Sequence, residues 1–280
     1  MGEIKENTGN VAVENIQATQ ITSPAKADRP VRCEIFHDNF ENSKSYNIPR
    51  AQMIIADIPF ALGDKMYASN PMWYKGGDNK NGESSLAHKA AFDRDYSFNI
   101  NNFFAFATRL LRKEPGKGEK GAPCVLIFCS FEQMHEVIEE GKKSGFKHYT
   151  PLVFVKPSSP QVLKANMKVL GACEYGLLLY RDKLPKFNNT DADGKHRMIK
   201  NWFEFRRDVK DIPRIHPTQK PVNLLKQLIT IFTDPRDVVI DPCCGSGSTL
   251  YAARELGRSA FGFEVSRDFY KKAREQMLGI

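Results

Sequence analysis

The distribution of apolar residues along the chain predicts strands that alternate with helices. Short apolar runs that stop at a polar residue are typical of buried parallel strands, whereas helices repeat apolar residues every three or four positions. Runs of the first kind occur at 31–36, 52–56, 124–129, 152–155, 175–180, 238–240 and 260–263. Spacing of the second kind occurs at 100–113, 131–143, 221–232 and 249–256. This order predicts an α/β fold with a mostly parallel sheet and helices on both faces.

Three segments interrupt the alternation. Residues 1–30 are polar and lack sustained periodicity, which predicts a flexible N-terminal tail, with a docked arm as the alternative. Residues 61–98 are rich in Asn, Gly, Lys and Asp and predict a long loop, and loops of this length are usually functional or disordered. Residues 181–215 carry more basic than acidic side chains, with aromatic residues between them. We expect 31–280 to form one domain that contains both later segments.

Composition narrows the class of protein only partly. The chain has 280 residues, and 41 Lys and Arg against 33 Asp and Glu give a net charge of +8. A basic surplus is compatible with a nucleic-acid partner but does not require one. The apolar runs are far shorter than the roughly 20 residues of a membrane span, and the N-terminus lacks the apolar core of a signal peptide. Six scattered cysteines predict free thiols and a reducing, cytoplasmic setting.

The sharpest local pattern is a predicted strand that runs into a glycine-rich turn and then a helix. The strand at 238–240 leads through Asp241 to Gly245 and Gly247, and glycines allow a backbone to approach a ligand closely. Glu264 ends the next predicted strand, where an acid accepts hydrogen bonds from ribose hydroxyls. Alternatively, the glycines only form a tight turn and Glu264 is a solvated strand end.

The same loop argues against some nucleotide ligands. Leu250 stands where a dinucleotide fingerprint has its third glycine, and there is no Gly-Lys-Ser/Thr sequence for a triphosphate. Asp241 would repel a pyrophosphate, but it suits an ammonium group or a role in holding the loop. A cofactor with a ribose and an amino-acid tail fits better, which favours S-adenosylmethionine.

A second pattern follows the predicted strand at 52–56. Asp57, Ile58, Pro59 and Phe60 place a carboxylate, a stiffened turn and an aromatic ring after a buried strand. On its own such a sequence is more often simply a turn.

Together these patterns resemble the DNA amino-methyltransferases in the order where the acceptor motif precedes the cofactor motif. Five segments carry the resemblance: Asp57–Phe60 is similar to DPPY/F, 241–249 to DPFxGSGTT, 216–221 to HPTxKP, 36–39 to the family's GD, and 174–180 to E-x-I-L-x-F. The chain departs from the family at Ile58 for a proline, at Cys243 for a phenylalanine and at His37 for a glycine.

The resemblance implies a Rossmann-like fold, S-adenosylmethionine as the cofactor, no metal, and a set of site residues. Asp57 and the carbonyl of Ile58 accept the two N–H groups of a base amine, Pro59 stiffens the turn, and Phe60 stacks on the flipped base. The implied cofactor-binding residues are His37, Asp38, Thr218, Lys220, Asp241, Cys243, Gly245, Gly247, Ser248, Thr249 and Glu264. No cysteine has a side chain that could act as its general base beside it in the sequence. A mechanism in which a thiol attacks a cytosine ring is therefore disfavoured.

The expected reaction is methylation of adenine N6 in double-stranded DNA, because an acceptor motif that begins with Asp is commoner among the family's adenine enzymes. Methylation of cytosine N4 is the near alternative, and methylation of RNA or a nicotinamide-binding role are remoter ones. We expect the segment 181–215 to read DNA through Arg197, Lys200, Arg206 and Arg207, with 61–98 as the rival segment and a solvated excursion as the plain alternative. The resemblance also suggests a bacterial or phage origin, and a homodimer remains open.

Overall fold

The computed structural model describes most of the predicted domain. The described residues are 30–59, 98–157, 162–164, 169–190, 193–208, 211–216 and 218–280. The predicted tail at 1–30, all but its last residue, and the predicted loop at 61–98, all but Phe98, lie outside them.

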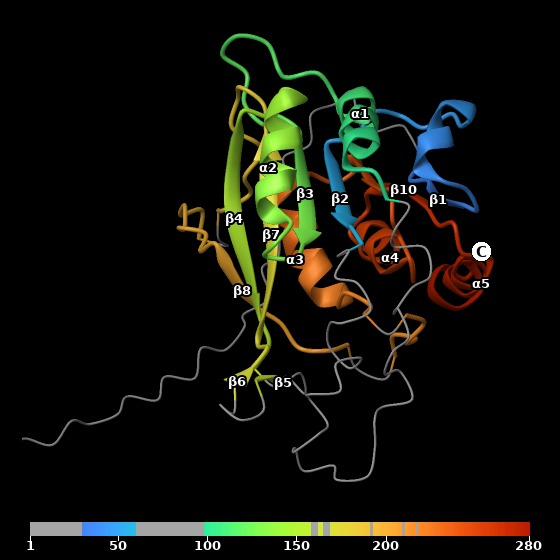
Figure 1. Cartoon of the computed structure of the whole chain (residues 1–280). Helices are drawn as coiled ribbons and strands as arrows, with labels where there is room; N and C mark the ends of the chain where they lie inside the picture. The colour runs from blue at the N-terminus through green and yellow to red at the C-terminus, as the bar shows by residue number, and fades with distance from the viewer. Residues whose placement is uncertain are drawn as a thin grey trace, which may run out of the picture.

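An eight-stranded sheet forms the centre of the described structure (Figure 1). Its strands are, in spatial order, β1 (Cys33–Phe36), β10 (Ser259–Phe263), β9 (Val238–Asp241), β2 (Met53–Asp57), β3 (Cys124–Cys129), β7 (Cys173–Tyr180), β4 (His148–Val155) and β8 (Trp202–Glu204). Every predicted strand is present. The short strand β8 lies in the charged segment that the apolar pattern left without elements.

Strand direction fixes which chain ends meet. The strands from β1 to β3 pair in parallel, whereas β7 is antiparallel to both β3 and β4. β8 is parallel to β4. A small two-stranded sheet of β5 (Val162–Lys164) and β6 (Val169–Leu170) lies between β4 and β7 in the chain. In the eight-stranded sheet, the carboxyl ends of all strands except β7 therefore share one edge, here called the carboxyl edge, and the opposite edge is the amino edge.

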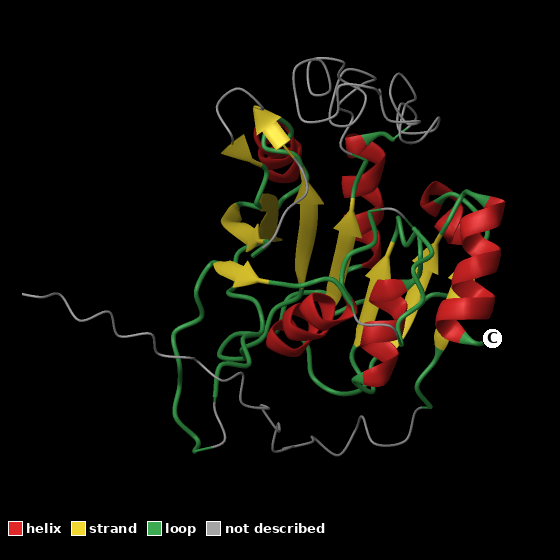
Figure 2. Ribbon diagram, turned by 90° about the horizontal axis from the view of Figure 1, so that it is seen from below, coloured by secondary structure: helices red, strands yellow, loops and turns green. Residues whose placement is uncertain are grey.

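Helices cover both faces of the sheet, as the alternation predicted (Figures 1 and 2). Ile54 and Ala56 of β2 pack with α1 (Ile100–Leu110) and α2 (Met134–Lys143) on one face. Met53 and Ile55, one position away, pack with α3 (Val222–Phe232) and α4 (Ser248–Glu255) on the other. Successive strand residues point to opposite faces, so a strand buried on both sides reads as an uninterrupted apolar run.

The C-terminal residues form a helix that the sequence analysis did not assign. Ser266 caps α5 (Arg267–Lys272) by accepting a hydrogen bond from Phe269 N–H, and a π-helical turn (Ala273–Leu278) continues it. A short 3-10 helix, η2 (Phe40–Ser45), was also not assigned and follows β1.

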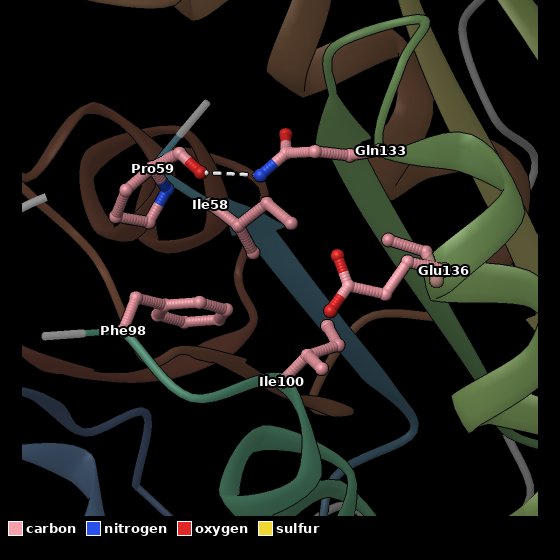
Figure 3. Close-up of a pocket in the computed structure, with 7 residues that line it drawn as sticks. Ile58, Pro59, Phe98, Ile100, Gln133 and Glu136 are labelled. Atoms are coloured by element: carbon pink, nitrogen blue, oxygen red, sulfur yellow. Dashed lines mark hydrogen bonds between the residues drawn. The ribbon is translucent and has the colours of Figure 1, made fainter. Parts of the chain in front are cut away.

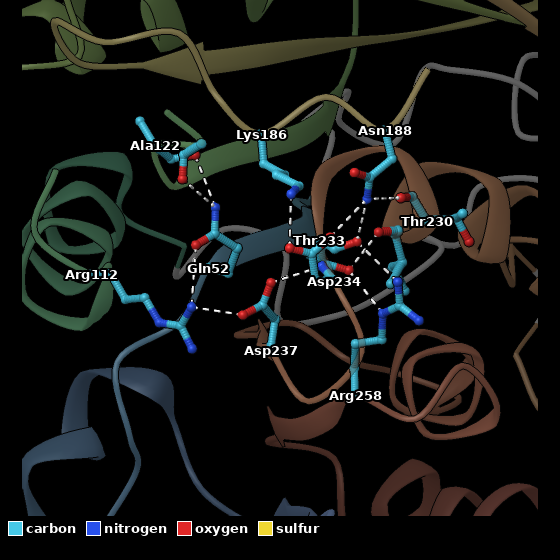
Figure 4. A network of polar contacts seen from close by, with 12 residues as sticks. Gln52, Arg112, Ala122, Lys186, Asn188, Thr230, Thr233, Asp234, Asp237 and Arg258 are labelled. Carbon is cyan, nitrogen blue, oxygen red and sulfur yellow. Dashed lines mark hydrogen bonds and ion pairs between the residues drawn. The ribbon is translucent and has the colours of Figure 1, made fainter. Parts of the chain in front are cut away.

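A polar network at the amino edge holds the first part of the 181–215 segment (Figure 4). The Asn188 amide donates to the carbonyls of Thr230 and Thr233 at 2.9 and 2.8 Å, at the end of α3. Lys186 forms an ion pair with Asp234 at 2.8 Å. The early residues of the segment therefore lie at the edge opposite Asp57, where they stabilise the end of α3.

Two expectations from composition concern the whole chain. The six cysteines, all within the described residues, are free thiols, as predicted. Among the described helices, none combines the length and apolarity that crossing a membrane requires.

Candidate active site

The carboxyl edge brings the two main sequence motifs together. Asp57 ends β2 and Asp241 ends β9, and the two strands are paired through Ile54 and Ile240. Glu264 follows β10, the next strand along. Chain order did not reveal that β2 and β9 are neighbours, and their pairing places the acceptor motif beside the glycine loop.

Asp57 is held by Lys220 through one of its two carboxylate oxygens. Lys220 Nζ lies 2.7 Å from Asp57 Oδ2, and the lysine side chain is only 9% exposed. Asp57 Oδ1 is buried and has no hydrogen-bond partner among the described residues. One oxygen of the acceptor carboxylate is thus paired, and the other is left to accept a hydrogen bond.

The ion pair extends to two further charges. Lys220 Nζ also lies 3.4 Å from Glu174 Oε2, and Lys156 Nζ lies 2.5 Å from Glu174 Oε1. Burial favours a low pKa for Lys220, but the charges of Asp57 and Glu174 hold that pKa above its usual value. Burial opposes ionisation of Glu174, yet Lys220 and Lys156 keep its pKa below normal. Burial raises the pKa of Asp57, against the opposing charge of Lys220.

The turn after Asp57 is tied to the end of β3 and to Gln133 at the start of α2, whose bond to Pro59 is drawn in Figure 3. Ile58 N–H donates to the carbonyl of Phe128 at 3.2 Å. The Gln133 amide donates to the carbonyl of Pro59 at 2.8 Å, and its oxygen accepts from Ser130 N–H at 3.1 Å. A cavity of about 150 Å³ lies behind this turn, lined by Ile58, Pro59, Phe98, Ile100, Gln133, Glu136 and Val137. Gln133 was not singled out in the sequence, and Phe60 lies outside the described residues.

The glycine loop is closed by its own hydrogen bonds. Asp241 accepts from Cys243 N–H at 3.0 Å and from the Thr249 hydroxyl, and Gly247 N–H donates to the carbonyl of Cys244 at 2.7 Å. Gly247 has a φ of 77° and is the N-cap of α4, whose first two residues are Ser248 and Thr249. A left-handed φ is costly for other residues, so this glycine is required by the turn.

Acidic groups dominate the electrostatics of the loop. Burial, together with smaller contributions from the charges of Asp57 and Glu264, raises the pKa of Asp241 to about 7. Glu264 accepts from Gly245 N–H at 3.0 Å and from Ser266 N–H at 2.6 Å. Glu264 therefore fastens the loop in addition to its expected role toward a ribose.

The HPTxKP-like segment (216–221) lies beside both the glycine loop and Asp57. A Cβ placed on Gly245 would meet nothing nearer than His216 Cδ2, at 3.9 Å. Burial and the charge of Lys220 lower the pKa of His216 to about 4, and Thr218 contacts its Nδ1 at 3.0 Å through the hydroxyl. Lys220, expected at the cofactor, forms ion pairs with Asp57 and Glu174.

The expected adenine-side residues lie after β1. Asp38 accepts from Asn42 and from the Tyr46 hydroxyl, both at 2.8 Å, and these bonds lower its pKa. The His37 ring stacks on Tyr270 with centroids 5.2 Å apart. Asp38 thus organises the start of η2, at the carboxyl edge of the sheet.

The four basic residues expected to contact DNA do not lie together. Phe205 N–H bonds to the carbonyl of Val155, the last residue of β4, so the exposed Arg206 and Arg207 follow at the carboxyl edge. Lys200 precedes β8 and lies over the Trp202 ring at 4.8 Å. Arg197 N–H bonds to the carbonyl of Asn189, which adjoins the amino-edge network.

The site's composition fits a cationic ligand that carries ribose hydroxyls. Asp241 and Glu264 are acceptors beside the glycine loop, and Gly245 leaves space for close approach. Carboxylates in this number favour a sulfonium or ammonium group and disfavour phosphates. Within the described residues, no group of His, Cys, Asp or Glu is arranged to hold a metal ion.

Comparison with known proteins identifies the family. A model of the DNA methylase family matches residues 51–275. The chain belongs to the DNA methylase family. The type II methyltransferase M2.DpnII of Streptococcus pneumoniae is 40% identical to this methylase over 250 residues, which cover 87% of this chain and 88% of M2.DpnII.

Other relatives are more distant. The Escherichia coli (strain K12) protein YubD is 28% identical over 156 residues, which cover 56% of this methylase and only 62% of YubD, less than two thirds. The crystal structure of the M1.HpyAVI–SAM complex has a TM-score of 0.60 at 18% identity, covering 86% of this chain and 97% of that one. The cytosine-N4-specific PvuII DNA methyltransferase also has a TM-score of 0.60, at 16% identity, with 87% and 86% covered. These two structures confirm the Rossmann-like α/β fold of the methylase.

Proposed function

We propose that this methylase transfers the methyl group of S-adenosylmethionine to the N6 amine of adenine in double-stranded DNA. The observation that carries the proposal is the state of Asp57, which has one oxygen paired with Lys220 and the other buried without a partner in the described structure. A buried acceptor without a donor is costly, and an N–H of a bound base satisfies it.

The chemistry at Asp57 follows from the weakness of the nucleophile. The lone pair of a base amine is delocalised into the ring, and hydrogen bonds from both N–H groups draw the nitrogen toward tetrahedral geometry. Asp57 Oδ1 accepts one N–H, and the carbonyl of Ile58 accepts the other. The methyl carbon would bond to N6 as its bond to the cofactor sulfur breaks, which leaves a neutral thioether, and the proton that N6 loses would leave through the hydrogen bond to Asp57 Oδ1.

The methyl donor binds at the glycine loop. When bound, S-adenosylmethionine supplies an activated methyl group on a cationic sulfur. Glu264 accepts from the ribose hydroxyls, Asp241 holds the amino-acid end, and Asp38 faces the adenine ring. Because β2 and β9 are paired, donor and acceptor lie side by side, and positioning supplies much of the rate enhancement.

Two observations support an amine target over a ring carbon. Burial and the charge of Asp57 raise the pKa of Cys129, the thiol at the end of β3, to about 12. Burial raises the pKa of Cys244 well above normal. Both thiols remain protonated at neutral pH, so neither is suited to nucleophilic attack on cytosine. Adenine is favoured over cytosine N4 by the leading Asp57 of the acceptor motif.

The DNA lies across the carboxyl edge in this proposal. Arg206 and Arg207 are exposed there, beyond β8, and such side chains bind phosphates or read guanine. Arg197 lies with Asn189 near the amino edge, which narrows the DNA-binding part of the 181–215 segment to its second half.

The proposed role of Asp57 is tested by Asp57→Ala and Asp57→Asn. We expect Asp57→Ala to lower methyl transfer to DNA by about 10²-fold or more, whereas the cofactor dissociation constant measured by calorimetry stays within about twofold of wild type. Asp57→Asn retains an acceptor oxygen and is expected to keep partial activity.

Asp182→Ala is the matched control, because Asp182 also pairs with a lysine at 2.7 Å but is exposed and far from the site. Its activity should equal wild type. Full activity of Asp57→Ala, or loss of cofactor binding in a folded Asp57→Ala protein, would show that Asp57 does not act on the amine.

A further inference from the structure

Lys220 lies across β3 and connects the two strands on either side of it. Its Nζ is 2.7 Å from Asp57 at the end of β2 and 3.4 Å from Glu174 near the start of β7, and β2 and β7 are the two neighbours of β3. Between them, Nζ lies 5.1 Å from the centre of the Phe128 ring of β3. An aromatic face and two carboxylates thus hold one buried ammonium group.

The charges around Lys220 balance only while the lysine is present. Lys156 pairs with the far oxygen of Glu174 at 2.5 Å, so two lysines and two carboxylates alternate from β2 to β4. Removing one member of a buried charged network leaves an uncompensated charge. Without Lys220, Asp57 has a carboxylate neighbour and no cation bonded to it.

We propose that Lys220 is a positioning residue of the acceptor site and not a cofactor ligand: it keeps Asp57 ionised and holds Oδ2, so that Oδ1 faces the amine. Glu174 and Lys156 in turn keep Lys220 in place. The inference rests on the proposed function, because it assigns Asp57 the role of amine acceptor. The inference thus assigns Lys220 of the HPTxKP-like segment to the site of the methyl acceptor and not to the site of the methyl donor.

The charged and titratable groups that face Asp57 determine the expected pH dependence. They are Lys220 before α3, Glu174 of β7, Asp241 of β9 and Cys129 of β3. Of these, only Lys220 favours the ionised carboxylate. An opposite charge at this distance commonly lowers the pKa of an aspartate by about 1–3 units, so removing Lys220 raises the pKa of Asp57 further.

The test compares Lys220→Met, Lys220→Arg and wild type by single-turnover methyl transfer to DNA between pH 5.5 and 9, with cofactor affinity measured by calorimetry. For Lys220→Met we expect the acid limb of the rate to move up by about 1–2 pH units, and the cofactor dissociation constant to stay within twofold. Lys220→Arg keeps the charge and is expected to retain the wild-type acid limb at a reduced rate. Thermal unfolding establishes that each variant is folded. If Lys220→Met does not fold, a tenfold or larger loss of cofactor affinity in Lys220→Arg would still overturn the inference.

Lys147→Met is the matched control, since Lys147 also pairs with an aspartate at 2.7 Å but is 63% exposed. Its pH profile should equal wild type. A tenfold or larger loss of cofactor affinity in Lys220→Met, or a rate lowered equally at every pH, overturns the inference. If Asp57→Ala remains active, the proposed function fails; if Asp57→Ala is inactive and Lys220→Met keeps the wild-type acid limb, only the role of Lys220 fails.

Discussion

Asp241 is a buried carboxylate whose ionisation costs the folded protein stability. It is 3% exposed, and burial together with the charges of Asp57 and Glu264 raises its pKa to about 7. Unfolded aspartate has a pKa near 3.9, so folding disfavours the charged form between these values. The folded protein therefore loses stability from this group as the pH rises from about 4 to about 7.

Asp241→Asn is expected to stabilise the protein without cofactor. The amide oxygen can still accept the hydrogen bonds from Cys243 and Thr249, and the buried charge is gone. At pH 8 we expect the free energy of unfolding to rise by on the order of 2 kcal/mol, with a smaller gain at pH 5. Cofactor binding should weaken. Denaturant unfolding at both pH values measures this, and an equal or larger gain at pH 5 would contradict the ionisation argument.

Gly262 is a position where the structure requires the absence of a side chain. A Cβ on this residue of β10 would lie 2.8 Å from Leu250 Cδ1 and 3.0 Å from Cys244 Sγ. We expect Gly262→Ala to destabilise the protein by about 1–3 kcal/mol through overpacking, and to weaken cofactor binding because Cys244 belongs to the glycine loop. Gly145→Ala is the comparison variant, because a Cβ at Gly145 has no neighbouring atom within 4 Å. Its φ of 90° adds backbone strain but no overpacking. Unchanged cofactor affinity in Gly262→Ala would argue that the loop tolerates displacement.

At this scale, sequence reasoning found the motif residues but not their partners. Strand ends and glycines have strong local patterns, and these patterns predicted the positions of Asp57, Asp241 and Glu264. Gln133 was missed because an isolated glutamine on a predicted helix carries no local signal. The partner of Lys220 lies 163 positions away, and no spacing rule predicts a contact at that separation.

Helix α3 positions Lys220, and its start is stabilised from another segment. Pro221 at its N-cap has no side-chain hydrogen bond to offer, and Asp208 accepts from Val222 N–H at 2.9 and 3.0 Å instead. The second half of the 181–215 segment is thereby bonded to Val222, two residues after Lys220.

Asp208→Ala is expected to cost about 1 kcal/mol of stability, the usual effect of removing a helix cap. Asp208→Asn retains an acceptor and should lose less. Methyl transfer should fall more in the alanine variant, because the start of α3 carries Lys220. Thermal unfolding and initial rates measure both effects, and identical behaviour of the two variants would exclude a capping role.

The elements themselves were largely predictable. The strand at 124–129 was predicted with its observed bounds, and the helix at 221–232 was one residue too long. The antiparallel direction of β7 could not be predicted, since an apolar run has the same appearance in either direction. The C-terminal helix had an available signal, with Ser266 as a cap and Phe269, Ala273 and Met277 at four-residue spacing, while the three-residue β8 offered too few positions for any periodicity.

At the scale of the whole molecule, the two sheet edges differ in the residues that they bring together. The carboxyl edge gathers Asp57, Asp241, Glu264 and the exposed Arg206 and Arg207, whereas the amino edge carries a structural network. The sequence could not separate these edges within the 181–215 segment, because the segment crosses from one to the other along β4. Only the pairing of β8 with β4 shows which basic residues lie near the site.

Neutralising Arg206 and Arg207 together should weaken DNA binding and reduce its dependence on salt. Each lost phosphate contact lowers the slope of log K against log salt by about 0.9, so a decrease of about 1–2 is expected. The double variant Lys195→Ala with Arg197→Ala removes the same charge nearer the amino edge and should leave the slope unchanged. The reverse ranking of the two double variants would move the DNA to the other half of the segment.

The identity of the methylated base tests the central proposal most directly. Purified methylase, duplex DNA and S-adenosylmethionine with a labelled methyl group are incubated, and the DNA is hydrolysed to nucleosides that are separated by mass. The account predicts label in N6-methyladenine. Label confined to N4-methylcytosine would contradict the choice of base, and the absence of label from DNA, with label in RNA under the same conditions, would contradict the choice of substrate.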